Sequence, residues 1–198
     1  MFYKIARAVV IFLVRVWFRV EIKGRENLPK EGGYIVIANH QNLLDPAFVT
    51  DAVIVKLSIM AKKELFKNKF LSALFYSLGA FPVDRGKGDM GAIEVAENKL
   101  KSGAVLLIFP EGTRSRKGEL LRFKNGATLI AGETGADVLP VVINYQNGRR
   151  IFGRVTVSIL PIIKNSELGM EKASMHAMKN ATKLLQATLN NELEALRK

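Results

Sequence analysis

Short, unbroken runs of apolar residues are the feature that most constrains the fold of this chain. Six such runs follow turn residues, at 34–38, 57–61, 80–83, 105–109, 138–143 and 155–160. Because their apolar residues do not alternate with polar ones, these runs suit strands that are covered on both faces. Four segments with helical spacing lie between them, at 46–56, 63–78, 90–101 and 122–134. The alternation predicts an α/β fold, with a mostly parallel mixed sheet flanked by helices.

The length and composition indicate a single globular domain. A chain of 198 residues can form one sizeable core but not two comfortable ones. An amphipathic segment at 171–197 predicts a last helix whose leucines join the core. With no cysteine, the chain can form no disulfide and has no thiol nucleophile. We therefore expect an amphipathic helix at residues 1–20 and one domain at 21–198.

Residues 1–20 predict a helix that lies at a membrane surface. Four basic residues interrupt this apolar segment: Lys4, Arg7, Arg15 and Arg19. They fall within about a third of a helical wheel, and this basic stripe would lie among anionic head groups. The longest uncharged stretch, 8–14, is far shorter than the roughly 20 residues of a spanning helix. The alternative is a helix packed on the core with its basic face in water.

The charge balance indicates an acidic partner. Thirty Lys and Arg against 18 Asp and Glu give a formal net charge of +12, which attracts nucleic acid, anionic lipid or phosphorylated substrates. The segment 114–124 is rich in basic residues, but it holds Phe123 as its one aromatic residue. Because single-stranded nucleic acid is bound largely by stacking on aromatic side chains, we do not expect a nucleic-acid partner.

A histidine and an acid follow the first predicted strand of the sheet. His40 is one of only two histidines, and Asp45 comes five residues later. On a regular helix the two would be about 140° apart, but a turn can bring them together. Pro46 favours a turn, because it disfavours helix at the preceding residue and suits the first helical position. The alternative is that Asp45 merely caps the next helix.

Two further segments, 79–85 and 109–115, close predicted strands with polar residues. Both contain an arginine, whose planar fork suits phosphate, and a glycine, which lets backbone approach a ligand. Each cluster alone also fits a solvated turn. Since ligands of open α/β sheets gather at the carboxyl ends of strands, three clusters together favour one binding site.

These motifs resemble those of the glycerolipid acyltransferases, above all the lysophosphatidic acid acyltransferases of bacterial phospholipid synthesis. The matching segments are Asn39-His40 with Asp45, Phe81-Pro82 with Arg85, the complete Phe-Pro-Glu-Gly-Thr-Arg-Ser at 109–115, Pro140, and the lysine-containing 61–65. Their order and spacing agree from about residue 24 to residue 160. Between His40 and Asp45 the family often has a serine, where this chain has Asn42.

The resemblance implies transfer of a fatty acyl group to lysophosphatidic acid, giving phosphatidic acid. The donor would be acyl carrier protein or acyl-coenzyme A, and neither a metal nor a cofactor is required. His40 would act as the general base, with Asp45 holding its ring. The acceptor site would be formed by Lys62, Lys63, Arg85, Glu111, Gly112, Thr113 and Arg114. The Gly112 amide is a candidate for stabilising the oxyanion.

Within this family the acceptor could instead be glycerol-3-phosphate or another lysolipid. The resemblance implies a peripheral or monotopic protein at the cytoplasmic face of the cell membrane. A rival motif is Gly86–Gly91, which matches a dinucleotide-binding fingerprint with Glu111 about 20 residues on. Asp84-Arg85 stands where the strand should reach the first glycine, and too little chain remains for a substrate domain. We therefore interpret this segment as a mobile loop that leads into a helix.

Overall fold

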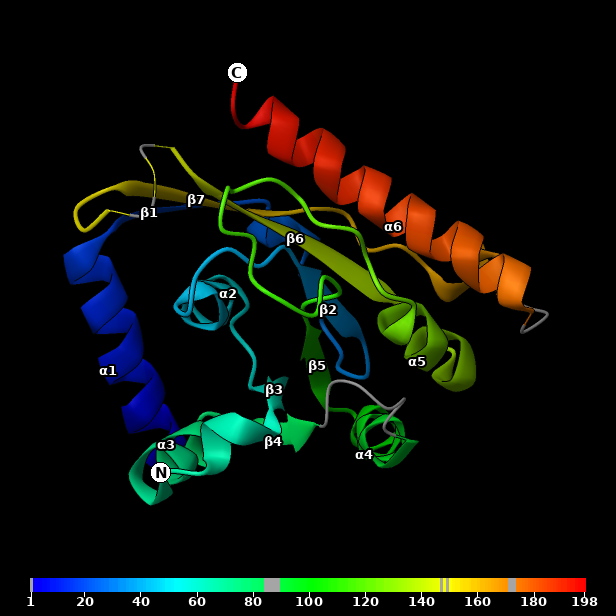
Figure 1. Ribbon diagram of the computed structural model, residues 1–198, viewed down its shortest axis with the longest axis horizontal. Helices are drawn as coiled ribbons and strands as arrows, with labels where there is room; N and C mark the ends of the chain where they lie inside the picture. Colours follow the sequence, from blue (N-terminus) through cyan, green and yellow to red (C-terminus); the bar gives the residue numbers. More distant parts are fainter. Residues whose placement is uncertain (1, 84–89, 147, 149, 171–173) are drawn as a thin grey trace.

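The computed structural model describes residues 2–83, 90–146, 148, 150–170 and 174–198 (Figure 1). In this part of the chain seven strands form one sheet in the order β1-β7-β6-β2-β5-β3-β4. Their bounds are β1 Arg19–Lys23, β2 Ile35–Ala38, β3 Leu57–Lys62, β4 Ala80–Val83, β5 Val105–Ile108, β6 Val138–Tyr145 and β7 Arg154–Ile159. All neighbouring strands are parallel except β6 and β7. The predicted α/β fold with a mostly parallel mixed sheet is confirmed.

Helices cover both faces of the sheet. The α-helices are α1 Phe2–Trp17, α2 Asp45–Ala52, α3 Lys69–Ser77, α4 Met90–Lys101, α5 Gly126–Thr134 and α6 Met175–Ala195. Short 3₁₀ helices are formed by Arg25–Asn27, Lys63–Phe66 and Asn165–Leu168. Residues of α1, α2 and α3 belong to the core on one face of the sheet, and those of α4, α5 and α6 to the core on the other.

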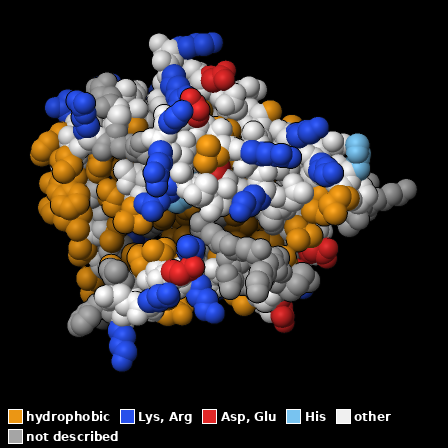
Figure 2. Space-filling model, viewed as in Figure 1, with side chains coloured by type: hydrophobic (Ala, Val, Ile, Leu, Met, Phe, Trp, Pro, Cys, Tyr) orange, Lys and Arg blue, Asp and Glu red, His pale blue; other side chains and the backbone are white. Residues whose placement is uncertain are grey.

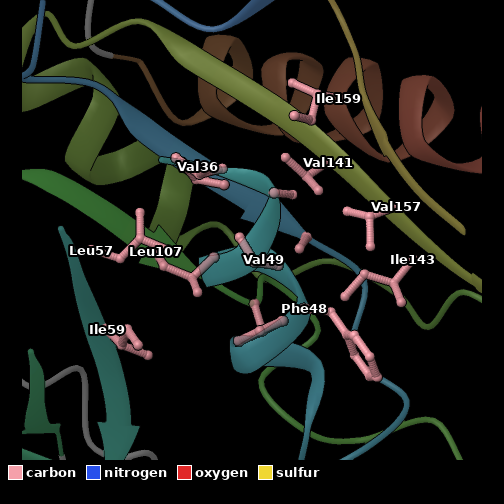
Figure 3. Packing of buried hydrophobic residues seen from close by; sticks show 14 of the residues in the cluster. Val36, Phe48, Val49, Leu57, Ile59, Leu107, Val141, Ile143, Val157 and Ile159 are labelled. Atoms are coloured by element: carbon pink, nitrogen blue, oxygen red, sulfur yellow. The ribbon is translucent and has the colours of Figure 1, made fainter. Parts of the chain in front are cut away.

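The central strands are buried on both sides, which explains their unbroken apolar sequences. Successive side chains of a strand point to opposite faces, so Val36 of β2 joins one core and Ile37 joins the other. Both are fully buried. Figure 3 shows Val36 in the first core, with Phe48 and Val49 of α2 packed against the same face.

Some element bounds differ from the sequence predictions. The N-terminal helix ends at Trp17 because the chain continues as β1, parallel to β7. The segment 63–78 forms a 3₁₀ helix followed by α3 rather than one helix. Helix α5 begins at Gly126 instead of residue 122, because the backbone just before it forms hydrogen bonds outside the helix. The Lys124 N–H, for example, donates to the Pro110 carbonyl at 2.8 Å.

Helix α1 turns part of its basic side toward the domain. The Arg15 guanidinium forms a two-pronged ion pair with Asp51, at 2.8 and 3.0 Å, and Arg7 donates to the Thr50 carbonyl at 3.0 Å. This corrects the expectation that the whole basic stripe lies among head groups. The opposite side of α1 is apolar and exposed, at Ile5, Val9, Phe12, Leu13, Val16 and Trp17. None of the helices in the described part of the chain is both long and apolar enough to cross a bilayer.

Candidate active site

The candidate site lies along the edge where the parallel strands end. His40 follows β2, Glu111 follows β5, and Lys62 and Tyr145 are the last residues of β3 and β6. Because β6, β2, β5 and β3 are neighbours and run parallel, their carboxyl ends meet at one edge. In open α/β sheets this edge is where ligands bind.

His40 and Asp45 are brought together by the turn between β2 and α2. The His40 Nδ1 atom lies 2.9 Å from Asp45 Oδ2. The Asp45 side chain is fully buried, whereas the His40 side chain is 12% exposed. An ionised carboxylate only accepts hydrogen bonds, so Nδ1 carries the proton and Nε2 has the free lone pair. The arrangement therefore presents a proton-accepting nitrogen, held in one orientation by a buried acid.

Both oxygens of the Asp45 carboxylate are engaged. Oδ2 also accepts the backbone N–H groups of Gln41 at 2.5 Å and Asn42 at 2.7 Å. Oδ1 accepts the Tyr145 hydroxyl at 2.5 Å. The two amides precede Asp45, so its side chain is turned to the loop before α2 and not to the first turn of the helix. The alternative that Asp45 merely caps the helix is wrong.

Tyr145 is a site residue that sequence reasoning missed. It is 8% exposed at the end of β6, and its ring also meets the Phe48 ring edge to face. A buried tyrosine hydroxyl usually needs a hydrogen-bond partner, and here that partner is Asp45. The signal in the sequence was a tyrosine at the end of an otherwise apolar strand, five residues after Pro140.

An apolar cavity of about 330 Å³ lies beside the histidine. The His40 ring stacks on the Phe109 ring with the centroids 4.2 Å apart, and both rings line the cavity. The other lining residues come from α1, α2, β3, α3 and the segments next to them: Val10, Leu43, Leu44, Pro46, Ala47, Thr50, Ile59, Met60, Ala61, Leu65, Phe75, Leu78 and Ala80. Walls of this composition suit a hydrocarbon chain.

A second cavity, of about 430 Å³, lies at the opposite end of the strands. Its lining includes Tyr34, just before β2, and Asp137, just before β6. Although it is larger, it contains no acid–histidine pair among its lining residues. The cavity beside His40 is therefore the better candidate for a reaction site.

Glu111 links the loops after β2 and β5. Its Oε1 atom accepts the His40 N–H at 2.6 Å, and its Oε2 atom accepts the Leu121 N–H at 2.9 Å. The Ser115 N–H completes the link by donating to the His40 carbonyl at 2.8 Å. Burial raises the pKa of Glu111 to about 7, although the His40 and Leu121 amides oppose this rise. Glu111 thus holds the backbone that carries the histidine.

Gly112 sits in a tight turn that uses its amide internally. Its N–H donates to the Phe109 carbonyl at 3.0 Å, so it is not available to an oxyanion while this turn persists. The φ angle is 69°, and a Cβ atom here would lie 3.0 Å from Cε of Lys124. The positive φ favours glycine at this position, and a larger residue would also have to displace the flexible end of the Lys124 side chain. Thr113 and Arg114 follow it and are exposed.

The lysines expected at the site lie at the end of β3. The Lys62 ammonium is 3.1 Å from the Glu64 carboxylate, and both side chains are about half exposed. Lys63 is exposed in the next 3₁₀ helix. Arg85 lies outside the described residues, as does most of the dinucleotide-like segment 86–91. Among the described residues, no group of three or more His, Cys, Asp or Glu side chains is placed to hold a metal ion.

Comparison with known proteins gives the family. A family model described as "Acyltransferase" matches residues 19–144, which include β1, His40, Asp45 and the loop after β5. The chain belongs to the acyltransferase family. It is 30% identical over 185 residues to the 1-acyl-sn-glycerol-3-phosphate acyltransferase of Bacillus subtilis, covering 89% of this chain and 91% of that protein.

Two further comparisons point to the same family. The 1-acyl-sn-glycerol-3-phosphate acyltransferase of Borreliella burgdorferi is 28% identical over 183 residues, covering 90% of this chain and 73% of that protein. The crystal structure of the 1-acyl-sn-glycerophosphate (LPA) acyltransferase PlsC from Thermotoga maritima matches with a TM-score of 0.78 and 28% identity. That match covers 98% of this chain and 79% of the Thermotoga chain. The fold as a whole, and not only the motif-bearing part, is that of an acyltransferase.

Proposed function

We propose that this protein transfers a fatty acyl group from a thioester donor to the free hydroxyl of lysophosphatidic acid. The observation that carries the proposal is that His40, held by the buried Asp45, lines an apolar cavity. A histidine held by a buried acid, beside walls that suit a fatty acyl chain, supports a general base at this position. The names of the relatives from Bacillus subtilis and Borreliella burgdorferi support 1-acyl-glycerol-3-phosphate as the acceptor.

The geometry supports direct transfer with no acyl-enzyme. The acceptor hydroxyl gives its proton to His40 Nε2 while its oxygen attacks the thioester carbonyl. Asp45 stabilises the imidazolium that forms, as the acid of a catalytic triad does. When the tetrahedral intermediate collapses, the carbon–sulfur bond breaks and His40 returns the proton to the leaving thiolate. The products are an ester, phosphatidic acid, and the free thiol of the donor.

The donor's acyl chain would occupy the cavity beside His40. The phosphopantetheine-bearing donors, acyl carrier protein and acyl-coenzyme A, are both acidic. A formal net charge of +12 attracts either one. Lys and Arg side chains are spread across the face seen in Figure 2, so the charge of the donor does not distinguish the two.

The acceptor's phosphate would be bound by Arg85 and Arg114, with Lys62 or Lys63 as a further cation. Arg114 is exposed and follows β5, while Lys62 ends β3, its neighbour in the sheet. Arginine's planar fork binds phosphate oxygens in pairs. Thr113 and the turn at Gly112 would shape the same subsite.

Helix α1 would hold the enzyme on an anionic membrane, at the cytoplasmic face, without crossing it. Its exposed stripe of apolar residues is unusual for a helix in contact with water, because such a stripe normally packs on the core. Here the core side of α1 has Val14, which is buried, and the ion pair from Arg15 to Asp51. A helix that turns its apolar side outward suits the bilayer interface.

The test is an acceptor panel with a labelled acyl donor and mass detection of products. The arms are lysophosphatidate, glycerol-3-phosphate and a phosphate-free monoacylglycerol. His40→Ala should fold normally and lose transfer by a factor of about 10² to 10⁴, the usual contribution of a general base. Asp45→Asn should also be severely impaired, because it disturbs the orientation of the ring.

The chain supplies its own control. His176, the other histidine, is exposed at the start of α6, so His176→Ala should keep full activity. Near wild-type turnover in folded His40→Ala would rule out the mechanism. Tight DNA binding by the wild type with no acyl transfer to any acceptor would favour a nucleic-acid-binding protein instead.

A further inference from the structure

The turn between β6 and β7 exposes two large apolar residues at its tip. Ile151 is 60% exposed and Phe152 is 71% exposed. Phe152 also has a φ of 65°, and for residues with a side chain this left-handed conformation costs about 1–2 kcal/mol. Neither the exposed ring nor the strained backbone contributes to the core. Strain of this kind is commonly retained where a residue serves a function.

The tip lies against the C-terminal end of α1. The Phe152 N–H donates to the Trp17 carbonyl at 2.5 Å, and the Gly153 carbonyl accepts the Arg19 N–H at 3.0 Å. The exposed apolar stripe of α1 ends at Val16 and Trp17, so the tip extends this stripe beyond the helix. Figure 1 shows the hairpin beside the end of α1, and Figure 2 shows apolar side chains gathered along the edge that α1 forms.

Exposed arginines surround the tip. Arg150 precedes Ile151 in the chain, Arg154 follows Gly153, and Arg19 is the register partner of Arg154 on the neighbouring strand. Like charges on opposite residues of adjacent strands repel each other, so this arrangement costs stability within the protein. An apolar tip with a rim of cations matches an anionic bilayer, whose head groups attract Lys and Arg at the edge of the inserted residues.

We propose that Ile151 and Phe152 are a second membrane anchor, inserted into the same leaflet as α1, with Arg19, Arg150 and Arg154 at the level of the head groups. The inference rests on the proposed membrane location of α1. A helix lying alone in the interface leaves the domain free to roll about the helix axis. A second inserted point opposes that rolling. It would keep the cavity, one wall of which is Val10 of α1, facing the lipid that supplies the acceptor.

The experiment uses Trp17, the only tryptophan of the chain, as a natural probe of insertion. Its fluorescence is recorded during titration with vesicles of phosphatidylcholine and phosphatidylglycerol, and with vesicles that carry brominated acyl chains. Wild-type Trp17 should shift to the blue and be quenched by bromine. Phe152→Gly should weaken vesicle partitioning roughly tenfold, the scale expected for part of a buried phenylalanine. Arg154→Gln should weaken binding only to vesicles that contain phosphatidylglycerol.

The glycine variant separates insertion from folding. Glycine adopts a positive φ freely, so Phe152→Gly should unfold at the same temperature as the wild type or at a higher one. Leu184→Ala is the matched control, because Leu184 is exposed on α6, on the other side of the sheet. This control should partition as the wild type does. The proposal would be overturned if Phe152→Gly partitioned onto vesicles as strongly as the wild type does. It would also be overturned if the variant lost partitioning and thermal stability together.

Two further measurements complete the design. Light scattering without vesicles should give the same mass for the wild type and Phe152→Gly; a dimer that the substitution dissociates would mean that the tip contacts a second copy of the chain. Turnover of a short-chain lysophosphatidate dissolved as monomers should be unchanged in Phe152→Gly. If the wild type is inactive on that substrate and on the acceptor panel, the proposed function fails, while the vesicle titrations still decide the anchor.

Discussion

Replacing Tyr145 by phenylalanine removes one hydroxyl from the buried side of the site. That hydroxyl donates to Asp45 Oδ1 at 2.5 Å. Since the Asp45 side chain is fully buried, bulk water cannot supply the missing donor without a rearrangement. A hydrogen bond to a charged group contributes roughly 1.5–3 kcal/mol. If the loss of this hydrogen bond raises the free energy of the transition state by the full amount, kcat should fall about 10- to 150-fold.

The loss should appear in kcat and not in KM. In the proposed mechanism Tyr145 acts through Asp45 as a positioning residue, and the interaction would gain importance when His40 becomes charged during the reaction. Asp45 would keep its bonds from Gln41 and Asn42, so the variant should remain more active than Asp45→Asn. The assay is initial rates at varied lysophosphatidate and saturating acyl donor, together with thermal unfolding of each variant.

Tyr34→Phe is the matched control. Tyr34 is 4% exposed, but it lies just before β2, at the end of the strand opposite to His40. This substitution should lower the free energy of unfolding about as much as Tyr145→Phe does, because both remove a hydroxyl from a buried ring. It should leave kcat unchanged. Wild-type kcat in Tyr145→Phe would refute the positioning role. Equal losses of kcat in the two variants would show that the effect is a general one on the fold.

Three other predictions concern the acceptor, the loop link and the cavity. Arg114→Ala should raise KM for lysophosphatidate roughly tenfold and leave kinetics with monoacylglycerol unchanged; equal losses on both acceptors would mean a structural role. The pKa of Glu111 is about 7 in the folded chain against an ordinary 4.5. Between these values the folded state binds more protons, so the free energy of unfolding should fall as pH rises, by up to about 3 kcal/mol. Urea unfolding at stepped pH should show this slope, and Glu111→Gln should lose it. Ala61→Leu should narrow the cavity and reduce transfer of long acyl chains roughly tenfold relative to short ones, measured with donors of graded chain length.

Patterns within short stretches of sequence predicted most of the strands and helices that form the site. The unbroken apolar runs identified the strands from β2 to β7, because those strands are buried on both faces. The spacing from His40 to Asp45 and the proline after it predicted a turn, and the side chains do meet there. The strand β1 was missed although Arg19–Lys23 alternates polar and apolar residues. This is the pattern of a half-exposed edge strand, and a search for unbroken apolar runs does not detect it.

Contacts between distant segments could not be predicted in this way. Tyr145 is 100 residues from Asp45, and only the pairing of β6 with β2 brings them together. Likewise, the sequence shows that residues 1–20 are amphipathic, but not which side meets the domain. Asp51 on α2 decides this, because a buried carboxylate needs a partner and Arg15 supplies it.

For the proposed action at a membrane surface, the sheet separates two different requirements. The lining of the cavity includes residues of α1, α2 and α3, which cover the side of the sheet that also carries the exposed apolar stripe. The other side is covered by α4, α5 and α6, whose buried residues form a separate core. His40 and Glu111 lie where strands shared by both cores end, so in the proposed function the second core would support the site from the side that does not meet lipid. Substitutions in α6 should therefore act through stability, whereas those in α1 and the hairpin tip should act through access to substrate.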